Sequence, residues 1–176
     1  MKRKYLGDSY DAVKRLWQET FSEWAPLFAE PRFIPEDIQN EFTALTRIPL
    51  LGINRPSFYS IFNDPDTGIR LPNRPNQREG ATHSNLPTIK KQLTEPAVCC
   101  VITFDQSHHR ERGFSPVDQR NAKVSWLRKQ RKHAFYYVSH APFLFAFSKH
   151  GDMKEARARL LKLGIPESRI EMPNCR

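Results

Sequence analysis

The sequence predicts a single α/β domain, residues 1–176, built on a mostly parallel sheet with helices on both faces. Its length suits one domain, since domains commonly run to about 100–200 residues. Segments with helical spacing alternate with short apolar segments, which is typical of sheets whose strands are joined by crossover helices. The continuous apolar run at 97–104 is typical of a central strand covered on both faces.

The first half of the chain predicts two long helices and three strands. Asp8 can cap a helix over 9–20, because the apolar residues that follow recur at the spacing of one buried face. A proline and two acids at 35–37 open a second helix that extends through Leu45, since acidic side chains suit the positive end of a helix dipole. Strands are expected at 24–29, 48–51 and 58–62. The last of these ends at a turn over 63–68 that contains proline and glycine.

The second half predicts the rest of the sheet. Residues 70–85 are polar and rich in proline, so we expect an exposed and mobile loop, followed by a short helix at 86–93. Ser115, Pro116 and Asp118 approximate a capping box that starts a helix reaching about residue 131. Strands are expected at 134–138 and 143–147, either paired or crossing a neighbour. Asp152 is expected to cap the last helix, Gly164 to end it, and 169–172 to add an edge strand.

The composition favours a nucleic-acid partner in the cytoplasm. The 28 Lys and Arg against 19 Asp and Glu give a net charge of +9, which attracts polyanions, although many basic cytoplasmic proteins bind no nucleic acid specifically. No apolar stretch approaches the roughly 20 residues that span a bilayer, and the start lacks the apolar core of a signal peptide. Cys99, Cys100 and Cys175 form no disulfide or metal-binding pattern.

Acidic residues and a histidine follow three of the predicted strands, and they are the candidate catalytic residues. Asp64, Asp66, Asp105 and His140 would converge if those strands are parallel neighbours, because the carboxyl ends of such strands share one edge. Carboxylates there would suit Mg²⁺ or Mn²⁺, with Asp64, Asp66 and Asp105 as ligands. The alternatives are that the aspartates serve only turns and helix caps, and that His140 is a hydrogen-bonded core residue.

A basic segment near the predicted helix at 115–131 is the candidate nucleic-acid-binding surface. It consists of Lys123, Trp126, Arg128, Lys129, Arg131 and Lys132. Cationic side chains would track phosphates, and Trp126 would stack on a base. The equally weighted alternative is that the segment is a solvated helix face and that Trp126 is turned into the core. Signatures of dinucleotide, P-loop, hydrolase-elbow and zincin sites are absent from the sequence.

Several motifs carry a resemblance to known groups of proteins. Segments 7–14, 64–69, 104–107 and 137–141, which read GDSYDAVK, DPDTGI, FDQS and YVSHA, resemble a group of uncharacterised bacterial and phage-associated proteins. Segment 7–14 is also distantly similar to the N-terminal segment of ribosomal RNA adenine-N6 methyltransferases, with Asp64-Pro65-Asp66 in place of their Asp-Pro-Pro-Tyr motif. That resemblance implies a Rossmann-like, methyltransferase-like fold and an S-adenosylmethionine site with Gly7, Asp8 and Lys14 among its binding residues. Glu30 and Pro31 stand where that family has glycines.

These observations leave three functions open. The first is a metal-dependent nuclease that hydrolyses phosphodiester bonds, with His140 as acid or base. The second is a methyltransferase-like protein with a degenerate cofactor loop. The third is a protein that binds nucleic acid without catalysis, for which the basic segment alone would be enough.

Overall fold

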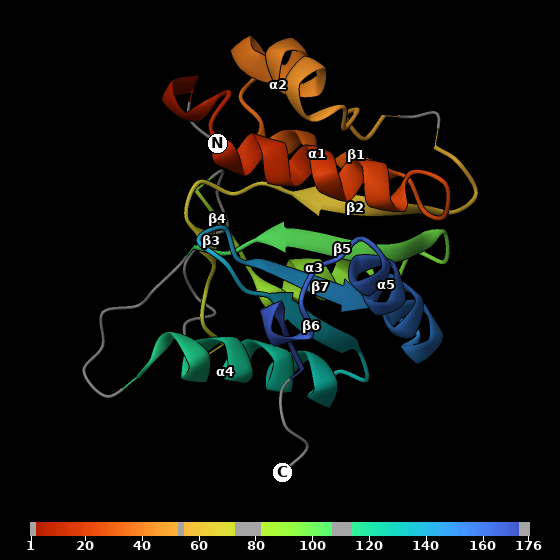
Figure 1. Cartoon of the computed structure of the whole chain (residues 1–176). Coiled ribbons are helices and arrows are strands. Elements are labelled where there is room, and N and C mark those ends of the chain that lie inside the picture. Colours follow the sequence, from red (N-terminus) through yellow and green to blue (C-terminus); the bar gives the residue numbers. More distant parts are fainter. Residues whose placement is uncertain (1–2, 53–54, 73–81, 107–113, 173–176) are drawn as a thin grey trace.

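A computed structural model describes residues 3–52, 55–72, 82–106 and 114–172. Its main sheet has six strands in the spatial order β1-β2-β5-β7-β6-β8 (Figure 1). The strands are β1 (Leu27–Ala29), β2 (Tyr59–Asn63), β5 (Val98–Phe104), β6 (His133–Tyr137), β7 (Phe143–Phe147) and β8 (Ile170–Glu171). Two short strands, β3 (Gly68–Ile69) and β4 (His83–Ser84), form a separate parallel pair.

The α/β class is confirmed, but the main sheet is mixed where the sequence predicts a mostly parallel one. β1, β2 and β5 pair in parallel, whereas β7 is antiparallel to both β5 and β6, and β8 is antiparallel to β6. The reason is the short connection at 138–142 between β6 and β7. A parallel crossover needs a dozen or more residues, so a link of this length permits only antiparallel pairing.

Five α-helices accompany the sheet within the described ranges. They are α1 (Ser9–Phe21), α2 (Gln39–Thr46), α3 (Leu86–Gln92), α4 (Pro116–Lys129) and α5 (His150–Lys162). The predicted capping box is confirmed, since the Ser115 hydroxyl accepts from the Asp118 backbone N–H and the Asp118 carboxylate accepts from that of Ser115. The predicted cap at Asp152 is wrong, because α5 begins at His150 and places Asp152 in its first turn. An acid there still suits the helix dipole.

The core lies on both sides of the sheet, and β7 shows how the sequence divides it. Phe143, Phe145 and Phe147 pack with residues of α1 and α5, while Leu144 and Ala146 pack with residues of α3 and α4. Alternate residues of a strand point to opposite faces, so one apolar run serves both halves of the core. Figure 1 shows α1 and α5 on the same side of the sheet.

Some predicted elements are shorter than expected. The predicted strand at 24–29 starts only at Leu27, and 48–51 contributes a single bridge between Ala29 and Leu50. The predicted edge strand at 169–172 forms as β8. Of the predicted mobile loop at 70–85, residues 73–81 lie outside the described residues, and β4 occupies its end.

Candidate functional site

A cavity of about 310 Å³ lies at the carboxyl ends of β2 and β5, beside the start of α1. Its lining residues come from these three places: Tyr5, Asp8, Tyr10, Lys14, Asp64, Pro65, Asp66, Phe104 and Gln106. This is the position where open α/β sheets bind ligands, just beyond the carboxyl ends of parallel strands. The volume is at the lower end of the range for small-molecule sites, about 300–1,000 Å³.

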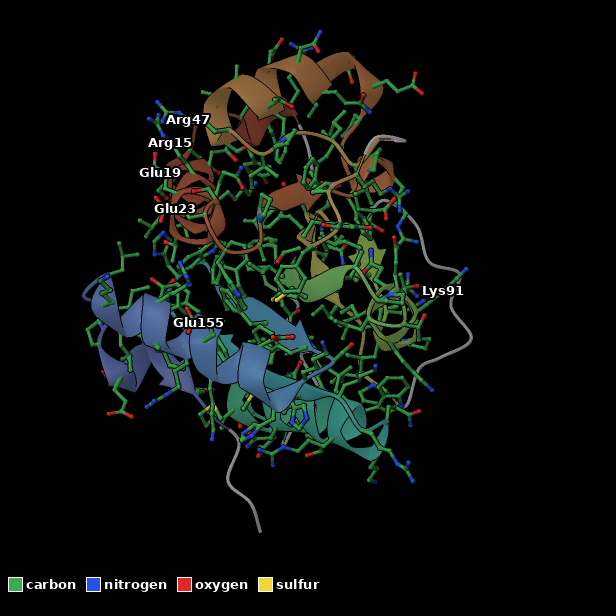
Figure 2. All side chains as sticks on the ribbon, turned by 90° about the vertical axis from the view of Figure 1, so that its right-hand side faces the viewer. Arg15, Glu19, Glu23, Arg47, Lys91 and Glu155 are labelled. Carbon is green, nitrogen blue, oxygen red and sulfur yellow. The ribbon has the colours of Figure 1, made fainter. Side chains whose placement is uncertain are left out.

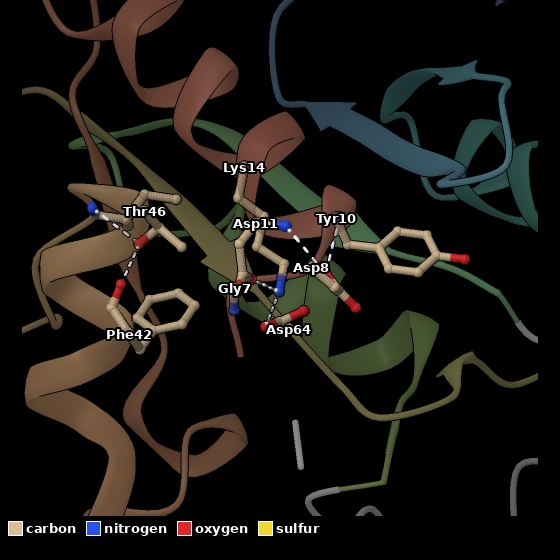
Figure 3. Close-up of polar contacts among 9 residues, drawn as sticks. Gly7, Asp8, Tyr10, Asp11, Lys14, Phe42, Thr46 and Asp64 are labelled. Carbon is tan, nitrogen blue, oxygen red and sulfur yellow. Dashed lines mark hydrogen bonds and ion pairs between the residues drawn. The ribbon is translucent and has the colours of Figure 1, made fainter. Parts of the chain in front are cut away.

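The start of α1 forms one side of the cavity and is held by its own side chains (Figure 3). The Asp8 carboxylate accepts hydrogen bonds from the backbone N–H groups of Tyr10 and Asp11, at 2.9 and 3.4 Å, as the sequence predicts for a helix cap. The Gly7 N–H donates to the Asp11 carboxylate at 2.7 Å, from a backbone with φ of +82° that favours glycine. These bonds fix the direction in which α1 presents its first turn to the cavity.

Lys14 joins α1 to the loop after β2. Its ammonium donates to Asp11 Oδ1 at 2.9 Å and to Asp64 Oδ2 at 2.7 Å, and all three side chains are buried (Figure 3). Burial alone lowers the pKa of Lys14, but the charges of Asp64 and Asp11 outweigh it, so the pKa lies above its ordinary value. Lys14 therefore stays protonated at neutral pH, with one face against the cavity.

Tyr10 forms an aromatic wall whose orientation is fixed from several directions. Its hydroxyl accepts from the Gln106 side-chain amide at 2.7 Å and donates to the His140 carbonyl oxygen at 3.3 Å. Its ring meets Phe104 edge to face, with centroids 5.5 Å apart. Three segments distant in the sequence are thus joined at this side chain.

Asp105 follows β5 but is not among the residues that line the cavity. Its carboxylate accepts from Lys123 Nζ at 2.6 Å, from the Tyr136 hydroxyl at 2.7 Å and from the Ile69 N–H at 2.8 Å. Burial, together with the charge of Asp105, raises the pKa of Tyr136 well above its ordinary value. The predicted convergence therefore brings Asp64 and Asp66 to one cavity, while Asp105 binds a separate set of partners.

Gly68 packs directly against Asp105 and the backbone of Gln106. A Cβ at this position would lie 2.5 Å from Asp105 Oδ1 and 2.8 Å from Asp105 Cα, and the φ of Gly68 is +128°. Only glycine satisfies both constraints, because it lacks a Cβ and adopts positive φ freely. The glycine of the Asp-Pro-Asp-Thr-Gly turn thus allows the loop after β2 to lie directly on the end of β5.

His140 is exposed, so the alternative that it is a core histidine is wrong. Its Nε2 lies 3.3 Å from the Ser9 hydroxyl, and its ring centroid lies 5.3 Å from that of Tyr10. The histidine therefore stands next to a lining residue of the cavity and reaches solvent. The sequence places two further histidines, His108 and His109, in a basic surface loop, and both lie outside the described residues.

The basic segment divides between interior and surface. Lys123 is buried against Asp105, which excludes it from the predicted phosphate-binding face. Trp126 is half-buried and packs against the core between α3, α4 and the sheet. Lys132 donates to the Leu93 carbonyl and the Ser148 hydroxyl, both at 3.3 Å. Arg128, Lys129 and Arg131 remain at least partly exposed.

Several residues that line the cavity are not among the site residues that the sequence predicts. Tyr10 and Phe104 were expected in the core, and no role was predicted for Gln106. One signal was present for the ion pair at the cavity, since Asp11 and Lys14 stand at i and i+3 and so share a helix face. No comparable local signal connects Tyr10 to Gln106, because that contact depends on how α1 docks on the sheet.

The described residues contain neither a cluster of metal-binding side chains nor a helix that could cross a membrane. Within residues 3–52, 55–72, 82–106 and 114–172, no three His, Cys, Asp or Glu side chains are grouped so that they could hold a metal ion by themselves. Over the same part of the chain, no helix is long and apolar enough to cross a membrane. A site that used a metal would therefore take ligands beyond these side chains, such as water or substrate oxygens.

No family model matches the chain, and no curated protein or solved structure is significantly similar to it. The features of the molecule that bear on function are therefore the side chains of the cavity, their charges and the basic character of the whole chain.

Proposed function

We propose that the protein is a nucleic-acid-processing enzyme that hydrolyses phosphodiester bonds with a divalent cation, and that the reaction takes place in the cavity beside α1. The observation that carries this proposal is the presence of Asp64 and Asp66 in one cavity, at the carboxyl ends of parallel strands, on a chain with a net charge of +9. The positive surface attracts the polyanion, and the carboxylates supply metal ligands.

The carboxylates that line the cavity would repel a bound phosphate unless a cation neutralised them. Three carboxyl groups, those of Asp8, Asp64 and Asp66, line the cavity with one ammonium, that of Lys14, which already binds Asp64 and Asp11. A phosphodiester brought to this place would be repelled by the carboxylates unless a divalent cation stood between them. Mg²⁺ or Mn²⁺ would neutralise both sides, polarise the phosphorus centre and lower the pKa of a bound water.

Two carboxylates are enough for such an ion. Mg²⁺ in nucleotide enzymes usually keeps several waters and is bound by one or two carboxylates together with substrate phosphates. Asp64 and Asp66 supply these ligands in the proposal, and Lys14 holds Asp64 in place. His140, exposed beside Tyr10, is the proposed acid or base, because an imidazole can carry out general acid–base catalysis and this one stands next to a lining residue of the cavity.

The experiment is a cleavage assay on single- and double-stranded DNA and RNA, with Mg²⁺ or Mn²⁺ and with a chelator. Asp66→Asn should lower the rate by about 100-fold or more, since it removes a metal ligand. Glu23→Gln is the matched control, because Glu23 is an exposed acid at the far end of α1 (Figure 2), and it should leave the rate unchanged. Absence of cleavage on every substrate contradicts the proposal. If binding then falls steeply with salt and is unaffected by Asp66→Asn, the protein binds nucleic acid without catalysis.

A methyltransferase-like protein is the second candidate, and a contact favours it. The two motifs behind that resemblance, segments 7–14 and 64–66, meet through the bond between Lys14 and Asp64. The finer Rossmann-like assignment of the fold belongs to this candidate, in which Gly7, Asp8 and Lys14 take part in binding S-adenosylmethionine. The test is heat stabilisation by S-adenosylmethionine, because a ligand of the folded state raises the melting temperature. No shift at saturating cofactor would exclude it.

Either candidate is proposed to act in the cytoplasm. Cys99 and Cys100 are free thiols in the core, and burial raises the pKa of both. Such thiols behave as small apolar side chains and need no oxidising compartment.

A further inference from the structure

The cavity beside α1 combines two kinds of wall that a phosphate group alone does not require. Tyr5, Tyr10 and Phe104 supply aromatic rings, and Asp8, Asp64 and Asp66 supply carboxyl groups to the same cavity. Aromatic walls stack on flat π-systems, and carboxylates accept hydrogen bonds. A flat ring that carries N–H donors on its edge would use both the aromatic rings and the carboxylates.

The aromatic wall is already in place before a ligand arrives. Tyr10 is held by Gln106, by the His140 carbonyl and by ring contacts with Phe104 and His140. A side chain that is fixed in this way loses little conformational freedom when a ring stacks on it, so more of the stacking energy remains for binding. A stacked base contributes about 1–3 kcal/mol in single-strand binding sites.

The hydrogen-bonding groups select among the bases. Ionised carboxylates only accept hydrogen bonds, and Gln106 uses one of the two N–H donors of its side-chain amide on Tyr10. Adenine, cytosine and guanine each present an exocyclic amino group, which a carboxylate can accept from. Uracil and thymine present carbonyl oxygens on either side of one N–H. The partial negative charges of these oxygens would be repelled by the carboxylates.

We propose that this cavity binds one nucleobase that carries an exocyclic amino group, stacked on Tyr10 and hydrogen-bonded to Asp66. The inference rests on the proposed function in one respect, since it makes the base a recognition element of the same nucleic-acid substrate. It also explains the size of the cavity, about 310 Å³, which suits a single nucleoside. The base would enter from a single strand or after it has left the duplex stack.

Cytidine and uridine are a matched pair of probes, because they differ chiefly in having an amino group or a carbonyl at one ring position. Binding of each nucleoside is measured by calorimetry or ligand-detected NMR, with chelator present and no metal. We expect cytidine to bind about tenfold more tightly than uridine, and adenosine to bind as well as cytidine. Asp66→Asn should reduce the preference to about threefold or less, and Glu23→Gln should preserve it.

Tyr10→Ala should weaken cytidine binding about tenfold, and its melting temperature shows whether the variant is folded. If it is not folded, Asp66→Asn still decides the matter. Equal binding of cytidine and uridine, or no binding of any nucleoside, overturns the proposal. The assay needs neither metal nor a phosphate, so its result is independent of cleavage. Cleavage with Mg²⁺ without any base preference would leave the proposed function standing and remove this inference alone.

Discussion

Two buried lysine–aspartate pairs stand at the ends of neighbouring strands, and one of them borders the cavity beside α1. Lys14 of α1 binds Asp64 after β2, and Lys123 of α4 binds Asp105 after β5. In both cases a helix supplies the ammonium and a strand end supplies the carboxylate. The first pair lies under an open cavity, whereas Gly68 and Tyr136 cover the second.

The difference shows that residue types alone do not distinguish a carboxylate that lines the cavity from one that is covered. Asp105 has the same position after a strand as Asp64, yet its carboxylate is used to bind Lys123, Tyr136 and the backbone of Ile69. Through that last bond, Asp105 holds the far end of the loop on which Asp64 and Asp66 stand. We infer that the second pair stabilises the fold, and that the first pair serves the site.

The largest expected effect comes from breaking the covered pair. Lys123→Met should lower the free energy of unfolding by about 3–5 kcal/mol, because it leaves the Asp105 charge buried without the ammonium that neutralises it. The measurement is the urea midpoint at neutral pH. Lys129→Met, an exposed lysine on the same helix, is the control and should change stability by less than about 0.5 kcal/mol. A loss below about 1 kcal/mol in Lys123→Met would show that the pair is not structural.

The next effect comes from the glycine that covers the same pair. Gly68→Ala should cost about 2–4 kcal/mol, since the new Cβ overlaps backbone atoms of Asp105 and Gln106 and the residue has positive φ. Gly164→Ala isolates the second contribution, because φ there is +92° and the surroundings are open, and it should cost about 1 kcal/mol. Equal losses in the two variants would mean that the close approach to Asp105 contributes nothing.

The smallest effect is a change in the alkaline pH dependence of stability. The pKa of Tyr136 is raised in the folded state, so above about pH 10 the unfolded chain loses this phenolic proton while the folded chain keeps it. The contribution of Tyr136 to the free energy of unfolding is fully present below the pKa of the unfolded chain. It declines as pH rises above that value, by up to about 1.4 kcal/mol per pH unit. Tyr136→Phe should therefore show a flatter decline from about pH 9 to about pH 11 in urea titrations. Lys14, also with a raised pKa, contributes in the same direction in both proteins. Identical slopes would contradict the assignment.

Much of the fold could be predicted from local patterns. The Asp8 cap, the capping box at Ser115 and the strand Phe143–Phe147 depend on residues adjacent in the chain, and the structure contains all three. The position of β7 between β5 and β6 depends on long-range pairing, which local patterns do not encode. The start of α5 was misplaced because Asp152 suits both a cap and a first turn.

The site could be predicted only in part. Gly7, Asp8, Lys14, Asp64 and Asp66 do gather in one place, since they sit at element ends on the same edge of the sheet. Lys123 was assigned to a basic surface because it belongs to a run of charges. Its neighbours Val124 and Leu127 are buried, and a lysine four residues before a buried leucine shares that inward face. The helical spacing of Lys123 was thus the better guide than the local charge.

The most direct test of the account is the NMR spectrum of the labelled protein with a single-stranded oligonucleotide and Mg²⁺. If nucleic acid binds in the cavity beside α1, the largest shifts in backbone amide signals should lie at Tyr10, Asp66 and Gln106. Smaller shifts are expected at the end of α4, near Arg128 and Lys129, where phosphates would be held by charge alone. Shifts confined to α4, with the cavity residues unchanged, would contradict the account.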